Sequence, residues 1–206
     1  MKKVLFTLAI ATFALLSFTT IKSDNQSTIS TTSIEEISLD GNVNIETSVI
    51  QWKGFKPTGS HAGTILLKEA SMTVKRGKLK AGKFVIDMST IKDKDGSKRL
   101  EGHLNSKDFF DIKKYPTATF EITKVKKKAG KLAVTGNLTL KDVTKSITIM
   151  ASISEIGEEY VFKSETFEIN RADFNVKYGS KSFFANLKDK FINDEMEISF
   201  EVRATK

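Results

Sequence analysis

The sequence predicts an all-β fold, either a sandwich or a barrel of antiparallel strands. Three segments carry an apolar residue or glycine at every second position, with mostly polar residues between, at positions 131–140, 147–153 and 196–202. This period of two places one face of each strand against the core and the other face in water, as antiparallel sheets require. Short strand-like runs separated by turn residues fill most of the remaining chain, and long helical periods are nearly absent.

The apolar rows of the three alternating segments define the expected core. They are Leu132, Val134, Gly136, Leu138 and Leu140; Ile147, Ile149, Ala151 and Ile153; and Met196, Ile198, Phe200 and Val202. Further strands are expected at residues 51–55, 64–74, 79–88, 118–125 and 161–169. Three glycines beside basic runs are expected in hairpin turns, namely Gly77, Gly82 and Gly130.

Two segments interrupt the strand pattern. Residues 98–106 are expected to form a short helix, because Leu100 and Leu104 share one helical face and Ser97 can cap the first turn. Residues 170–190 contain one glycine and four aromatic side chains, and this content predicts an irregular segment before the last strand. Such an insertion could close one end of a barrel.

The N-terminal 40 residues predict export. Lys2 and Lys3 precede an apolar run at residues 4–18, which is short for a membrane span and suits a signal peptide. We therefore assign residues 1–20 to a signal peptide, with an uncleaved anchor as the alternative. Residues 21–40 form an expected flexible polar spacer. Residues 41–206 remain as one domain, expected in the periplasm or secreted.

The net charge of +8 comes from lysine-rich runs near the expected hairpin turns. The runs are Lys75, Arg76, Lys78, Lys80 and Lys83, and then Lys124, Lys126, Lys127 and Lys128. They could attract an anionic membrane surface or a pyrophosphate group, but solvated hairpin ends that resist aggregation are the favoured interpretation. Nucleic-acid binding is not expected, because no aromatic stacking motif accompanies the lysines.

The residues with reactive or metal-binding side chains form no catalytic or metal-binding motif. The chain lacks cysteine, which excludes a thiol nucleophile and any thiolate metal site. The two histidines, His61 and His103, show no chelating spacing, so neither a metal nor a cofactor is expected. Ser60 beside His61 is no catalytic pair, because neighbours on a strand point to opposite faces. Each histidine is expected to bond loop backbone or to line the mouth of a barrel.

Two further polar groups allow more than one interpretation. Arg171 could meet a ligand head group, or it could fix the turn at residues 170–174 through Asp173, and the structural role is favoured. Asp108 and Asp111 bracket two phenylalanines and could perform acid–base chemistry. Capping of the surrounding backbone turns is the favoured interpretation for these carboxylates.

Three segments of unusual sequence give the chain a family resemblance. They read EGHLNSKDFFDIKKYPTATF at residues 101–120, GNLTLKDVT at 136–144 and INRADF at 169–174. In this order they resemble the YceI-like family of secreted bacterial proteins. The matching residues are His103, Leu104, Asp108, Phe109, Phe110, Tyr115, Pro116, Thr119, Phe120, Gly136, Leu138, Thr139, Val143, Thr144, Asn170, Arg171, Asp173 and Phe174. Asn175 replaces the usual glycine, and asparagine tolerates a positive φ there.

The resemblance implies a closed, lipocalin-like barrel of about eight strands that binds a polyisoprenoid or quinone-like lipid without catalysis. The expected pocket follows from aromatic placement and comprises Trp52, Phe55, Phe84, Phe109, Phe110, Phe120, Phe174, Tyr178, Phe183 and Phe184. Head-group or mouth positions are expected at His61, His103 and Arg171. The alternative is a filled barrel whose basic surface binds a membrane or a protein partner. A dimer is compatible with the sequence.

Overall fold

The computed structural model describes residues 43–206, and the expected signal peptide and spacer lie outside the described residues. The strands are β1 (Val43–Lys56), β2 (Gly59–Lys75), β3 (Lys78–Asp93), β4 (Thr117–Lys128), β5 (Lys131–Leu140), β6 (Val143–Ile156), β7 (Glu159–Ser164), β8 (Phe167–Asn170) and β9 (Glu195–Thr205). The helical elements are α1 (Lys98–Asn105) and the short 3-10 turns η1 (Arg171–Phe174) and η2 (Lys188–Lys190). Consecutive strands from β1 to β7 pair antiparallel, and β9 pairs with β7, β8 and β1. The pairing of β1 with β9 closes the barrel.

The barrel is eight-stranded although the chain forms nine strands, because β7 and β8 lie one after the other along β9 and together take one position in the barrel. Lys163 pairs with Glu201, and Phe167 pairs with Ile198, which leaves one extra residue between β7 and β8. Ser164 Oγ accepts the N–H of Phe200 at 2.9 Å and satisfies a donor at this bulge. The single strand expected at residues 161–169 is therefore wrong, whereas the closed barrel of about eight strands is confirmed.

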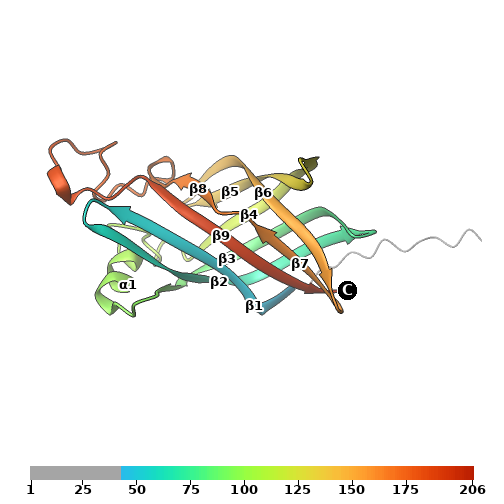
Figure 1. Ribbon diagram of the computed structural model, residues 1–206. Coiled ribbons are helices and arrows are strands. Elements are labelled where there is room, and N and C mark those ends of the chain that lie inside the picture. The colour runs from blue at the N-terminus through green and yellow to red at the C-terminus, as the bar shows by residue number, and fades with distance from the viewer. Residues whose placement is uncertain (1–42) are drawn as a thin grey trace, which may run out of the picture. The chain divides into compact units, whose positions relative to one another are not determined.

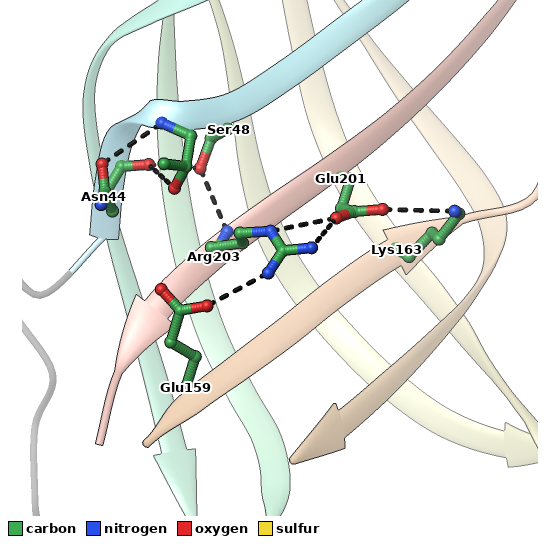
Figure 2. A network of polar contacts seen from close by, with 7 residues as sticks. Asn44, Ser48, Glu159, Lys163, Glu201 and Arg203 are labelled. Carbon is green, nitrogen blue, oxygen red and sulfur yellow. Dashed lines mark hydrogen bonds and ion pairs between the residues drawn. The ribbon is translucent and has the colours of Figure 1, made fainter. Parts of the chain in front are cut away.

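A polar network joins β1, β9 and β7 at the closure (Figure 2). β1 shifts register between Asn44 and Val49, where Ser48 Oγ donates to Asn44 O at 2.6 Å and accepts the N–H of Arg203 at 3.1 Å. The Arg203 guanidinium pairs with Glu159 at 3.1 Å and with Glu201 at 2.6 Å. Because the Arg203 side chain is about one-third exposed, solvent screens these pairs, so the network contributes mainly to register.

Inward-facing apolar side chains form the core, as the alternating pattern predicts. Val134, Ile149 and Val202 from three of the expected rows are at most 2% exposed. Gly136 occupies one inward position because a Cβ there would lie 2.5 Å from Cζ of Phe120 on the neighbouring strand. The glycine thus makes room for an aromatic ring inside the barrel.

The two ends of the barrel differ. We call the mouth the end that carries the β1–β2 and β5–β6 turns, α1 and the segment 171–194, and the far end the one that carries the other hairpin turns. Figure 1 shows α1 and the segment before β9 at one end and the β2–β3 tip at the other. The basic runs of β2–β3 and β4–β5 therefore approach the far end, away from the mouth.

Two of the three glycines expected in hairpin turns occupy them. Gly77 and Gly130 follow Arg76 and Ala129, and each pair has positive φ at both positions, as a two-residue I′ turn requires. Gly82 instead lies inside β3, opposite Met72, so its expected turn is wrong. A Cβ on Gly82 would come within 2.9 Å of the ring of Phe84, so packing explains this glycine.

Helix α1 agrees with the sequence. Ser97 caps it by accepting the N–H of Leu100 at 3.3 Å, and Leu104 is buried while Leu100 packs against the core. The irregular segment expected at residues 170–190 is also confirmed, with only η1 and η2 as regular turns. Within residues 43–206, no helix combines the length and the apolar character that a bilayer crossing demands.

Candidate functional site

An inner cavity of about 110 Å³ lies within the barrel, and every residue that lines it is apolar. Strand alternation places these side chains, because each strand contributes its inward row. The lining residues are Ile50, Ile65, Leu67, Phe84, Ile86, Met88, Phe110, Ala118, Phe120, Leu138, Leu140, Ile147, Ile149, Phe167, Ile169, Met196, Ile198, Phe200 and Val202. A space without polar side chains suits the hydrocarbon part of a ligand.

An outer cavity of about 440 Å³ lies at the mouth and mixes aromatic with polar and charged side chains. Its polar and charged lining residues are Lys56, Thr58, His61, His103, Arg171, Tyr178, Asp189, Lys190 and Asn193. Ile65, Phe110 and Met196 line both cavities, so the two spaces adjoin at these side chains. The outer volume falls within the roughly 300–1000 Å³ of small-molecule sites, whereas the inner one is smaller.

The structure brings together most of the aromatic residues that the sequence nominated. Phe84, Phe110 and Phe120 line the inner cavity, and Trp52, Phe55, Phe109, Phe110 and Tyr178 line the outer one. The expected mouth residues His61, His103 and Arg171 also line the outer cavity. Phe174 is buried in η1 and lines neither cavity, while Phe183 and Phe184 are 42% and 49% exposed and also line neither.

Arg171 holds the segment 171–194 together by donating to three of its backbone carbonyls. Its Nε donates to Asn193 O at 2.9 Å, Nη1 donates to Val176 O at 2.7 Å, and Nη2 donates to Ile192 O at 2.9 Å. The side chain is only 2% exposed, and Nη2 lies 3.3 Å from Oδ1 of Asp194. The acidic partner is therefore Asp194, whereas the sequence pointed to Asp173. With its guanidinium bound to three carbonyls, Arg171 stabilises the mouth.

The charges of this buried pair follow from its surroundings. Burial of the Arg171 guanidinium lowers its pKa, and Asp194 and Glu195 oppose that effect. Burial alone would raise the pKa of Asp194, but contacts from Ser180, Ser182 and Arg171 outweigh it and lower that pKa below its ordinary value. Ser182 Oγ donates to Asp194 Oδ2 at 2.6 Å. The carboxylate is thus held ionised beside the guanidinium.

Lys141 and the left-handed turn at Asn175 connect the loop after α1 with the segment 171–194. Lys141 Nζ, in the β5–β6 turn, donates to Phe109 O at 2.7 Å and to Asn175 O at 3.1 Å. Asn175 has φ of 57°, as expected for the residue that replaces the family's glycine. Tyr178 adds an edge-to-face contact with His103, with ring centroids 4.5 Å apart. The loop after α1 and the segment 171–194 therefore form one wall.

Trp52 leaves a polar atom unsatisfied. The side chain lines the outer cavity, and its Nε1 is buried without a hydrogen-bond partner among residues 43–206. A buried unpaired donor costs about 1–3 kcal/mol, so such atoms point to a ligand or a water. Trp52 is also the only tryptophan of the chain, which makes it a specific fluorescence reporter for the cavity.

Sequence reasoning about aromatic residues missed the aliphatic majority of the inner cavity. Leu138, Ile149 and Met196 belong to alternating rows that the sequence assigned to the core, so inward position was the available signal. Asp93 and Asp95 were also missed. They lie close to His61 only because β2 and β3 pair, and no local motif announces this proximity.

Comparisons with known proteins agree with this architecture. A family model of the YceI-like domain matches residues 41–204. Protein YceI of Escherichia coli O157:H7 is 37% identical over 102 residues, which are 47% of this chain and 53% of that protein. The chain thus spans about half the length of this curated relative.

Two solved structures share the fold. BcnA of Burkholderia cenocepacia has a TM-score of 0.66 and 25% sequence identity, with 79% of this chain and 99% of that chain covered. A polyisoprenoid-binding domain of Saccharophagus degradans, implicated in plant cell wall breakdown, has a TM-score of 0.58 and 14% identity, with 79% and 96% covered. At that identity, the second similarity concerns the fold alone. The family match spans nearly all described residues, and this chain belongs to the YceI-like domain family.

Proposed function

We propose that this protein binds a long-chain apolar lipid, polyisoprenoid or quinone-like, and carries or stores it without chemical change. The single observation that carries the proposal is an entirely apolar inner cavity that adjoins a larger, polar-lined cavity at the mouth. This polarity gradient matches a molecule with a hydrocarbon tail and a polar head. Membership in the YceI-like family and the polyisoprenoid-binding domain with the same fold support the assignment.

The energetics favour recognition of the tail. Removal of hydrocarbon from water contributes about 0.8 kcal/mol per CH₂, so one five-carbon unit contributes roughly 4 kcal/mol before costs. A hydrogen bond to a charged group contributes about 1.5–3 kcal/mol. Two or more buried units therefore outweigh any single polar contact, and chain length governs affinity more than head chemistry does.

The head group would lie among the polar residues of the outer cavity. His103 and Lys190 line this space, whereas Arg171 lines it with a guanidinium already bound to backbone carbonyls. We therefore place the head near His61, His103 and Lys190, with the Nε1 of Trp52 as a further donor. Arg171 supports the wall and does not act as the main head-group contact.

The inner cavity must widen to accept several isoprene units. Its 110 Å³ is smaller than an engineered cavity of about 150 Å³ that holds one benzene ring. The five phenylalanines are the largest side chains in its lining, and rotation of rings such as those of Phe84, Phe120 and Phe200 is the simplest way to gain volume. A filled barrel that acts as an interaction module has less support, because an apolar space remains at the centre.

Binding of prenyl alcohols tests the proposal directly. We expect farnesol, geranylgeraniol and solanesol to raise the melting temperature and to change Trp52 fluorescence, with affinity rising along the series until the cavities are full. Geranylgeranyl pyrophosphate should differ from geranylgeraniol by less than the gain from one added unit. Equal binding of a head-group analogue without a tail, or no response to any chain, would contradict the proposal.

The mouth also offers a surface for lipid uptake from a membrane, and the expected signal peptide supports a periplasmic location. Phe183 and Phe184 form an exposed aromatic pair, and Lys177 Nζ lies 4.8 Å from the ring centroid of Phe183. Lys181 Nζ lies 3.4 Å from the ring centroid of Phe191. An exposed aromatic pair with lysines nearby suits the interface of an anionic bilayer. We propose that the mouth, not the lysine-rich far end, contacts the membrane.

A double substitution tests which end of the barrel contacts the membrane. Phe183→Ser with Phe184→Ser should weaken binding to anionic vesicles about tenfold or more, since each half-exposed ring contributes on the order of 1 kcal/mol on insertion. Affinity for a soluble short-chain ligand should remain. The control carries Lys126→Ser and Lys127→Ser near the far end. A larger loss of vesicle binding in the control would assign membrane contact to the basic hairpins instead.

A further inference from the structure

A side-chain cluster beside the mouth has the donor set of a metal site. His61 in β2, Asp93 at the end of β3 and Asp95 in the following turn each offer one atom, and these three atoms lie within 4.8 Å of one another. The cluster combines one imidazole nitrogen with two carboxylates. Nitrogen and oxygen donors of this kind suit divalent transition metals, zinc among them.

The atoms inside the cluster lack hydrogen-bond partners. Oδ1 of Asp93 and Nδ1 of His61 are both buried, and neither has a hydrogen-bond partner among residues 43–206. The Asp93 side chain is completely buried, and its Oδ1 lies 3.7 Å from the His61 nitrogen, which is too long for a hydrogen bond. A buried carboxylate oxygen without a partner is costly, so this pair is arranged for a third participant.

The distance between the two buried atoms, Nδ1 of His61 and Oδ1 of Asp93, suits a shared cation. Two ligands at about 2.0–2.1 Å from a tetrahedral zinc ion lie about 3.4 Å apart, close to the 3.7 Å between the Asp93 and His61 atoms. Asp95 is exposed, so the third side of the cluster is open to solvent. An ion bound here would keep water in its remaining position.

Neighbouring groups orient the buried carboxylate. The other oxygen of Asp93, Oδ2, accepts the N–H of Ser97 at 3.0 Å, just before α1 begins. The backbone N–H of Asp93 donates to Glu101 Oε1 at 3.3 Å, and Lys92 and Lys98 pair with the same Glu101 side chain. Such supporting contacts are typical of metal ligands. They also balance the charge of Glu101, which leaves the two aspartates to balance a divalent cation.

We propose that His61, Asp93 and Asp95 bind one divalent transition-metal ion, with zinc as the probe. The site lies in the wall of the outer cavity, since His61 lines that space, and it does not depend on lipid binding. Its occupancy would tie the β3–α1 turn to β2 beside the mouth. Metal titration in the absence of any lipid therefore tests it separately from the lipid-binding proposal.

The two histidines allow a clean experiment. Mature protein without a histidine tag is stripped with chelator and titrated with zinc, while calorimetry and the nitrogen-detected NMR signals of both imidazole rings are recorded. We expect one ion per chain with a dissociation constant on the order of micromolar, and perturbation of the His61 ring with the His103 ring unchanged. Absence of saturable binding up to ~1 mM zinc would overturn the proposal.

Matched variants assign the ligands. His61→Gln and Asp95→Asn should each weaken zinc binding by at least about tenfold, and His103→Gln should leave it unchanged. Asp95 is exposed, so its variant tests the site even if Asp93→Asn disturbs the cap of α1. Zinc binding that survives in both His61→Gln and Asp95→Asn, or that is lost in His103→Gln, would show that the ion binds elsewhere.

Discussion

Replacing Ala118 with leucine is expected to weaken the binding of a long prenyl chain about 50-fold while short chains bind as before. Ala118 lines the inner cavity from β4, and leucine adds three carbon atoms to a space of about 110 Å³. The added atoms displace about three methylene groups of ligand, worth about 2.4 kcal/mol together. Fluorescence titration of Trp52 with solanesol and farnesol measures both affinities.

The stability of this variant separates a blocked cavity from a damaged fold. Filling an existing cavity commonly raises the free energy of unfolding, so Ala118→Leu should be at least as stable as the parent protein. The matched control is Ala133→Leu, which makes the same change on the outward face of the neighbouring strand β5, outside both cavities. Equal loss of solanesol binding in the two variants, or unchanged binding in Ala118→Leu, would place the tail outside the inner cavity.

Replacing Arg171 with alanine is expected to lower the free energy of unfolding by about 3–5 kcal/mol. The substitution leaves Asp194 buried without its cation, and it removes the N–H groups that donate to three backbone carbonyls. Arg171→Lys should recover only part of the loss, since an ammonium group lacks the planar fork that reaches all three carbonyls. Chemical denaturation followed through Trp52 measures the change.

Arg203 supplies the comparison for this prediction. It too pairs with carboxylates, but its side chain is 32% exposed and solvent screens it. Arg203→Ala should therefore cost about 0–1 kcal/mol. A loss in Arg171→Ala no larger than that in Arg203→Ala would show that the mouth segment does not depend on the buried pair.

The buried pair of Arg171 and Asp194 predicts that the stability of the protein depends on pH. The pKa of Asp194 is lower in the folded protein than its ordinary value of 3.8, so the unfolded chain binds protons more readily. The stabilisation from this carboxylate is therefore complete above its unfolded pKa and is lost as the pH falls through its folded pKa. The difference in unfolding free energy between the parent protein and Asp194→Asn should shrink below about pH 4. A difference that stays constant in acid would contradict the role of the charge.

The sequence predicted the strands well where one face of each is apolar. Residues 131–140 illustrate this, because their alternation continues without interruption from turn to turn. The break between β7 and β8 was missed, although the inward apolar positions change from Phe162 to Phe167 and Ile169. That change from even to odd numbering is the sequence trace of the extra residue. Gly82 was misassigned because a glycine beside lysines suits a turn, and only its neighbour Phe84 shows why it belongs in a strand.

The candidate site could be predicted only in part, because tertiary contacts create the rest. Phe110 and Phe120 were expected from local sequence, and both line the inner cavity. The partner of Arg171 was not, since Asp194 lies far along the chain and local spacing favoured Asp173. The cluster of His61 with Asp93 likewise depends on a β2–β3 register that contains bulges. Whether an inward-facing side chain meets a ligand or another side chain depends on how all strands of the barrel pack.

Native mass spectrometry of the mature protein, purified from its own host and followed by organic extraction, tests the lipid-binding proposal most directly. We expect a discrete adduct that extracts as a long isoprenoid or quinone-like lipid. A bare mass that persists after incubation with quinones and prenyl phosphates would contradict lipid carriage.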